Sequence, residues 1–84
     1  MANNWQQVTI NESILYCERA GFKCREFDPF AMEIKDYYLP GTKIEFKYQV
    51  QNSDPMKFFI WPRIDGKDVT MEEFKEAVIK AKGN

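Results

Sequence analysis

The strongest constraint on the fold is a strict two-residue alternation along residues 43–51. The even positions are aliphatic or aromatic, and the odd positions are lysine, glutamate or glutamine. Because successive side chains of a β-strand point to opposite faces, this segment is predicted to be a strand with one buried face. We expect its core face to carry Ile44, Phe46, Tyr48 and Val50, and its other face to carry Lys43 and Lys47.

A returning strand is predicted over residues 56–61, after a polar, proline-containing loop at residues 52–55. Pro62 follows this strand, and proline has no N–H to donate to a neighbouring strand. We therefore expect the ladder to stop at Pro62 or to run along a sheet edge there. The Asp65-Gly66 pair that comes next is typical of a tight hairpin turn.

The C-terminal helix has clear start and stop signals. Thr70 and Glu73 form a capping box, Val69 and Phe74 are spaced as a hydrophobic staple, and Gly83 is expected to end the helix. Its apolar stripe is Met71, Phe74, Ala77, Val78 and Ala81.

An N-terminal helix is predicted from about Thr9 to the glycine at Gly21, which suits a left-handed C-terminal position. Asn11 can cap this helix, and Thr9 with Glu12 offers a second capping box two residues earlier. The apolar residues at helical spacing are Ile10, Ile14 and Cys17, with Ala20 beside them.

The segment between these elements is less clearly marked. Residues 22–27 alternate weakly and favour a short strand, and residues 31–38 are interpreted as a strand whose Asp36 indicates a bulge. Asp28-Pro29 is also a good helix start, so a helix over residues 29–38 remains the alternative.

These elements predict a single α+β domain over residues 1–84. It has two layers, an antiparallel sheet of three or four strands with an N-terminal and a C-terminal helix, in the order α-β-β-β-α. Residues 1–8 are expected to be a flexible arm or a short strand that docks through Trp5.

The composition argues against catalysis. The 84-residue chain contains no histidine, which removes the commonest general base and most transition-metal sites. No nucleotide-binding or nucleophile-elbow motif occurs. We therefore expect a protein that is not an enzyme and that holds no cofactor or metal. The net charge of −1 also argues against binding nucleic acid or anionic lipid by bulk charge.

Two smaller features have simple structural interpretations. Cys17 and Cys24 are expected to be small, buried apolar residues that stay reduced, with a regulatory or intermolecular disulfide as the alternative. Asp65-Gly66-Lys67-Asp68 superficially resembles a calcium loop, but its register places Trp61 and Arg63 where oxygen ligands are needed. The absence of a signal-peptide pattern and of a long apolar run predicts a cytoplasmic protein with no membrane contact.

The most informative candidate site is the sheet face that points away from the core. If Phe58 and Ile60 face inward, their odd-numbered neighbours face outward. Strand 31–38 adds Tyr37 to this face if Ile34 faces inward. The predicted binding residues are Tyr37, Lys43, Lys47, Lys57, Phe59 and Trp61.

Three interpretations of this aromatic and lysine-rich face follow. In the first, the Trp5 arm or residues 22–30 cover the face; in the second it binds a protein; in the third it stacks single-stranded nucleic acid. We expect a small, non-enzymatic protein-binding module that docks on a larger protein as an inhibitor, adaptor or accessory subunit. A phage or mobile-element accessory protein fits this description. Single-stranded nucleic-acid binding through the same face is the alternative, and the oligomeric state is left open.

Overall fold

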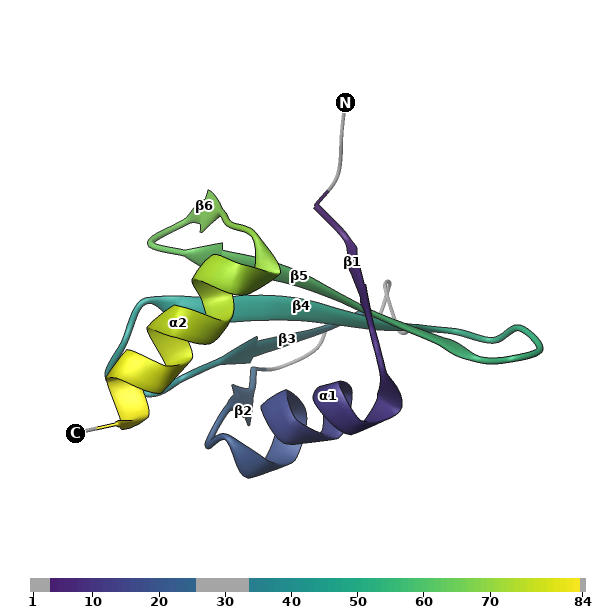
Figure 1. Cartoon of the computed structure of the whole chain (residues 1–84), viewed down its shortest axis with the longest axis horizontal. Helices are drawn as coiled ribbons and strands as arrows, with labels where there is room; N and C mark the ends of the chain where they lie inside the picture. Colours follow the sequence, from purple (N-terminus) through teal and green to yellow (C-terminus); the bar gives the residue numbers. More distant parts are fainter. Residues whose placement is uncertain (1–3, 26–33, 84) are drawn as a thin grey trace.

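The computed structural model describes residues 4–25 and 34–83, in which one antiparallel sheet carries both helical segments on the same side (Figure 1). The N-terminal part comprises β1 (Gln6–Val8), α1 (Ile10–Ile14), the π-helix η1 (Leu15–Arg19) and β2 (Lys23–Cys24). The remaining elements are β3 (Ile34–Tyr38), β4 (Ile44–Gln51), β5 (Lys57–Ile64), β6 (Lys67–Asp68) and α2 (Met71–Lys82).

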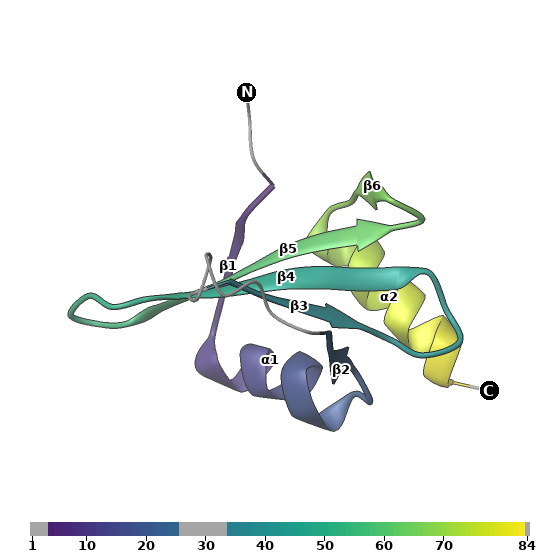
Figure 2. The same ribbon diagram turned by 180° about the vertical axis from the view of Figure 1, so that it is seen from behind.

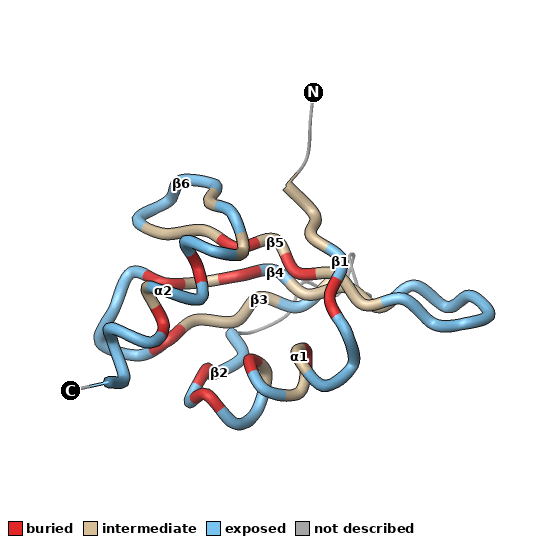
Figure 3. Tube along the Cα trace, viewed as in Figure 1, coloured by how far each residue is buried: buried red, intermediate tan, exposed pale blue. Residues whose placement is uncertain are grey.

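The strands of this sheet lie in the order β1-β5-β4-β3-β2, and β6 also pairs with β5. Strands β1 and β6 therefore share one edge of β5. β1 pairs with Phe58–Ile60, and β6 pairs with Arg63 and Ile64. The long β4–β5 hairpin extends beyond the rest of the sheet, and its tip, residues 51–57, is exposed (Figure 3).

Aromatic side chains fill the space between the sheet and the helices. Phe46 and Phe74 are fully buried, and their ring centroids are 5.8 Å apart. Phe22 packs edge-on against Phe46 at 4.9 Å, and Tyr16 packs against Phe74 at 5.1 Å. Strand β4 and the helical segments η1 and α2 thus meet at one aromatic cluster.

The best-marked sequence signals are confirmed. Residues 44–51 form β4 with Ile44 and Phe46 buried. Thr70 caps α2 through a complete capping box with Glu73. The Asp65-Gly66 turn has positive φ at both residues, 54° and 77°, as a tight hairpin turn between twisted strands requires.

The predicted fold class is confirmed, but the strand count and the element order were imprecise. Within residues 4–25 and 34–83 the sheet has six strands instead of three or four, and a strand precedes the first helix. Strand β2 lies within the short strand predicted over residues 22–27. The additional strands β1 and β6 are three and two residues long, which is too short for an alternating pattern to identify them. Within residues 4–8, the docking alternative is the one observed, because Gln6–Val8 pair with β5 and Trp5 packs on Trp61.

The N-terminal helix buries a different face from the one that the sequence predicted. Ile10 is 53% exposed, whereas Ser13, Tyr16 and Ala20 are buried. After α1, the Ala20 N–H bonds to the Leu15 carbonyl five residues back, and this π-helical turn rotates the side chains of η1 relative to those of α1. The cap is Thr9, whose hydroxyl accepts from the Glu12 N–H.

The bulge expected at Asp36 was wrong, whereas at Pro62 the second of the two expected alternatives, an unpaired edge position, is observed. Asp36 makes no bulge, because β3 and β4 pair without interruption from Ile34 to Tyr38. Strand β5 does not stop at Pro62 but continues to Ile64. The Pro62 carbonyl accepts from Val69 N–H, so the backbone of Pro62 points away from β4, and its missing N–H faces the gap between β1 and β6.

Residues 34–38 are a strand, so the helix alternative is wrong for that part of residues 29–38. The predicted Asp28-Pro29 helix start and residues 31–33 lie outside the described residues. So do residues 26 and 27 of the predicted strand over residues 22–27.

Candidate functional site

The side of the sheet opposite the helices, which we call the outer face, is formed by alternate residues of β3, β4 and β5. Because Phe46 and Ile60 are fully buried on the helical side, the odd-numbered residues of β4 and β5 point the other way. Figure 2 shows this side of the sheet, with α2 behind the strands. The outer face comprises Trp5, Asp36, Tyr38, Glu45, Lys47, Phe59, Trp61 and Arg63.

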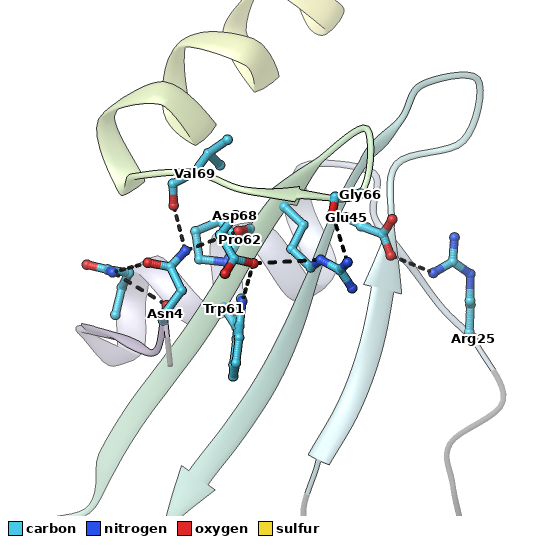
Figure 4. A network of polar contacts seen from close by, with 10 residues as sticks. Asn4, Arg25, Glu45, Trp61, Pro62, Gly66, Asp68 and Val69 are labelled. Atoms are coloured by element: carbon cyan, nitrogen blue, oxygen red, sulfur yellow. Dashed lines mark hydrogen bonds and ion pairs between the residues drawn. The ribbon is translucent and has the colours of Figure 1, made fainter. Parts of the chain in front are cut away.

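Two tryptophans meet on this face. The rings of Trp5 and Trp61 are 5.3 Å apart between centroids and 77° apart in plane, an edge-to-face contact. The Trp61 indole Nε1 donates to Asp68 Oδ1 at 2.7 Å (Figure 4). Both tryptophans are half-buried. Trp61 is thus fixed at its polar end while part of its ring remains accessible.

The N-terminal strand is fastened beside this tryptophan pair by Asn4. The Asn4 side-chain Nδ2 donates to the Val69 carbonyl at 2.7 Å and to the Pro62 carbonyl at 3.3 Å (Figure 4). Asn4 thereby occupies the gap between β1 and β6, and it donates to two backbone carbonyls that these short strands do not pair.

Most charges on the outer face are paired. Arg25 contacts Asp36 at 3.3 Å and Glu45 at 3.1 Å, and its guanidinium lies 4.8 Å from the centre of the Tyr38 ring. These carboxylates, with the Glu45 hydrogen bond as the largest cause, raise the pKa of Arg25.

Arg63 forms a second paired centre on this face. It donates to the Gly66 carbonyl at 2.9 Å, and its Nε lies 3.8 Å from Asp68 Oδ1, which is an ion-pair distance too long for a hydrogen bond. The outer face is therefore close to neutral.

The structure brings together four of the six predicted binding residues. Phe59 and Trp61 are half-buried on the outer face, and Lys47 and Lys57 are exposed beside them. Lys43 lies just before β4, 3.3 Å from Asp65, and so belongs to the end of the sheet.

Tyr37 was placed on the wrong side. It is paired in register with Phe46 and stacks on it, with 5.1 Å between centroids and 13° between planes. Ile34 consequently faces outward. The prediction used Ile34 to orient the strand, whereas in the structure the strand is oriented with Tyr37 stacked on the central Phe46.

Sequence reasoning did not assign Trp5, Tyr38 and Arg25 to the site. The isolated Trp5 was a usable signal, because it was expected to dock on this face as a cover. Nothing local indicates which of Tyr37 and Tyr38 faces the core, and the pairing of Arg25 depends on residues that are distant in the chain.

On the helical side of the sheet, a separate group of polar side chains consists of Cys17, Tyr37 and Tyr48. Burial raises the pKa of the Cys17 thiol to about 11, with the neighbouring Tyr37 acting in the opposite direction. Burial also raises the pKa values of Tyr37 and Tyr48. At neutral pH these groups are protonated, so they provide neither a nucleophile nor a base.

Two chemical properties complete the description of the site. Within residues 4–25 and 34–83, no three His, Cys, Asp or Glu side chains are grouped so that they could hold a metal ion. None of the helices in that part of the chain combines the length and the apolar character needed to cross a membrane.

Comparisons of the chain with protein-family models, with curated proteins and with solved structures found no match.

Proposed function

We propose that this chain is a non-enzymatic docking module that binds a larger protein through the outer face of its sheet. The observation that carries the proposal is the half-exposed Trp5–Trp61 pair beside Phe59, on a face that no described helix covers. Tryptophan is among the residues most enriched at the energetic centres of protein interfaces.

The local hydrogen bonding supports such a role. The Trp61 N–H and the Asn4 amide already have partners, so a partner protein would cover aromatic carbon without stripping water from unpaired polar groups. Fixed aromatic rings also lose little conformational entropy on binding. The Trp5–Trp61 pair is therefore suited to act as a preorganised anchor.

The charge pattern favours a protein over nucleic acid. Asp36, Glu45 and Asp68 lie on or beside the outer face, and Arg25 and Arg63 are engaged by them. Among the described residues, Lys47 and Lys57 are the cations near the aromatic pair that make no ion pair. A phosphate backbone would gain two cations and meet three carboxylates, whereas a mixed protein surface can complement both signs.

The proposed role includes an inhibitor, adaptor or accessory subunit, and phage or mobile-element proteins of this kind remain one class among these. Both cysteines are free. Free thiols fit a reducing compartment such as the cytoplasm, which is part of the proposal.

The experiment that tests the proposal is quantitative affinity capture from the source organism with three baits. These are the wild-type chain, Phe59→Ser on the outer face, and Ile10→Ser as a matched control, because Ile10 is an exposed residue on the helical side. We expect one partner to be retained by the wild type and the control, and about tenfold less of it to be captured by Phe59→Ser. Equal recovery by all three baits would contradict the proposal.

Tryptophan fluorescence distinguishes the nucleic-acid alternative. Titration with a single-stranded oligonucleotide at low salt should leave the emission of Trp5 and Trp61 unchanged. Quenching that weakens steeply as salt is added would replace the protein-docking proposal with nucleic-acid binding.

A further inference from the structure

A groove of about 450 Å³ lies between η1 and α2, on the helical side of the molecule and away from the outer face. In Figure 1, α2 crosses in front of the sheet, and the helical coil that begins with α1 lies below it. The apolar walls of the groove are Leu15, Tyr16, Ala20, Val78 and Ile79. Its volume lies in the range of about 300–1,000 Å³ that is typical of small-molecule sites.

Unusually exposed aliphatic side chains form the two sides of this groove. Ile79 is 68% exposed and Leu15 is 43% exposed. They come from different elements, η1 and α2, yet both line the same groove. Single exposed apolar residues need no explanation, but two of them facing a common apolar floor form a continuous surface that a ligand could cover.

The polar lining of the groove has one sign of charge. Arg19, Lys75 and Lys82 line it, and no carboxylate of the described residues does. Lys75 is paired with Glu12 at 3.2 Å. Arg19 makes no ion pair within the described residues, so its charge remains available.

Lys82 is held in place at the end of the groove. Its Nζ donates to the Ala20 carbonyl at 2.8 Å, which satisfies a carbonyl at the C-terminal end of η1. An ammonium group has three N–H donors, so two remain for a ligand. The contact also offsets the partial negative charge of the helix end, which would otherwise repel an anion.

We propose that this groove binds a small amphipathic anion, an alkyl carboxylate in monomeric form. The alkyl chain would lie against Leu15, Val78 and Ile79, and the carboxylate would contact Arg19 and Lys82. The combination of an apolar floor with cations at its rim is complementary to this class of ligand. The site is independent of the outer face, so its occupancy does not depend on the proposed protein docking.

The test is a ¹⁵N NMR titration of the full chain with dodecanoate below its micellar concentration. Saturable shifts are expected at the amides of Leu15, Arg19, Ile79 and Lys82, and no comparable shifts at Phe59 or Trp61. Dodecyltrimethylammonium has the same tail and the opposite charge, and it should bind at least about tenfold more weakly.

Two matched pairs of variants separate the apolar and the charged contributions. Ile79→Glu should abolish binding while Ile10→Glu, an exposed isoleucine outside the groove, should retain it. Arg19→Glu should weaken binding about tenfold, and Lys57→Glu, the same charge reversal on the β4–β5 hairpin, should not. Circular dichroism verifies folding, and the exposed Arg19 provides the decisive variant if Ile79→Glu fails to fold.

Three results would overturn the proposal. The first is equal binding of the cationic and anionic amphiphiles, which would indicate a non-specific apolar surface. The second is dodecanoate shifts that lie outside the groove or do not saturate. The third is binding to phosphatidylglycerol vesicles without binding of monomeric dodecanoate, which would assign this side of the molecule to a membrane surface instead.

Discussion

Phe46 stands at the centre of the interior, between the rings of Phe22, Tyr37 and Phe74. Its side chain is fully buried on β4, which lies between β3 and β5 in the sheet. Edge-to-face and stacked contacts around one ring stabilise it beyond the burial of apolar area alone. A single substitution at this position should therefore affect every layer of the domain.

We expect Phe46→Ala to lower the free energy of unfolding by about 3–5 kcal/mol, because it leaves a cavity surrounded by three other aromatic rings. Urea denaturation monitored by circular dichroism measures this change. Phe59→Ala, which removes the same atoms from a half-buried position on the outer face, should cost clearly less. Equal losses for the two variants would mean that the two faces of the sheet have been wrongly assigned.

The two cysteines differ in environment and should differ in reactivity. The expectation that both are buried was wrong for Cys24, which is exposed, whereas Cys17 is half-buried with its pKa raised to about 11. At pH 8 a thiol-specific disulfide reagent should therefore modify Cys24 quickly and Cys17 slowly. The Cys24→Ser variant isolates the slow reaction, and rapid modification of that variant would contradict the burial of Cys17.

The same shift predicts a loss of stability at alkaline pH. The ordinary pKa of the thiol is 9.0, so the unfolded chain releases this proton before the folded chain does. The contribution of Cys17 is fully present below pH 9 and is lost as the pH rises through about 11. The raised pKa values of Tyr16, Tyr37 and Tyr48 act in the same direction. Urea midpoints measured from pH 8 upward should fall, and they should fall less for Cys17→Ala.

At the scale of elements, the two helices show when local sequence determines structure. In α2, the cap, the apolar stripe and the final glycine lie within one continuous segment, and the predicted helix matches the observed Met71–Lys82. In the N-terminal helix, the spacing of Ile10 and Ile14 predicts one continuous α-helical face. The α-helix instead ends after five residues at a π-turn, in which Tyr16 packs on Phe74. That turn depends on a contact with the other end of the chain, so no local spacing could reveal it.

The capping box of α2 makes a quantitative prediction. The Thr70 hydroxyl accepts from the Glu73 N–H at 3.1 Å, and the Glu73 carboxylate accepts from the Thr70 N–H at 3.2 Å. Thr70→Ala should lower the free energy of unfolding by about 1 kcal/mol because one N–H at the helix start loses its acceptor. Thr70→Ser keeps the hydroxyl and should be close to wild type. Similar losses for alanine and serine would show that the methyl group, and not the cap, is important.

At the scale of the whole molecule, the outer face could be predicted only where strand periodicity was sufficient. The alternation in β4, together with the assumed inward Phe58 and Ile60 in β5, correctly placed Lys47, Phe59 and Trp61. The facing of β3 depends on which side chain stacks on Phe46, which is a tertiary choice, and Tyr37 was therefore misplaced. The contribution of Trp5 depends on a pairing between segments about fifty residues apart, as Gln6 opposite Ile60 shows.

Removal of residues 1–8 should uncover both the Phe58–Ile60 edge of β5 and the ring of Trp61. An exposed strand edge pairs readily with other chains, so we expect concentration-dependent self-association in sedimentation experiments. The Trp61 emission should also shift to the red. Trp5→Ala, which keeps the β1 backbone, should reproduce the red shift without the association. A monomeric truncated protein would contradict the protective role of β1.

The late pairing of β1 has a consequence for biosynthesis. The partner residues of Gln6–Val8 are translated some fifty positions after them, and Asn4 finds the Val69 carbonyl later still. In a nascent chain that stops before Phe58, the side chains of Trp5 and Val8 would therefore remain exposed to solvent. Closing so large a loop also slows folding. The strand Gln6–Val8 therefore has no pairing partner for most of the synthesis of this small domain. Truncated translation products, in which this strand stays unpaired, should be the species that quality-control proteases remove first.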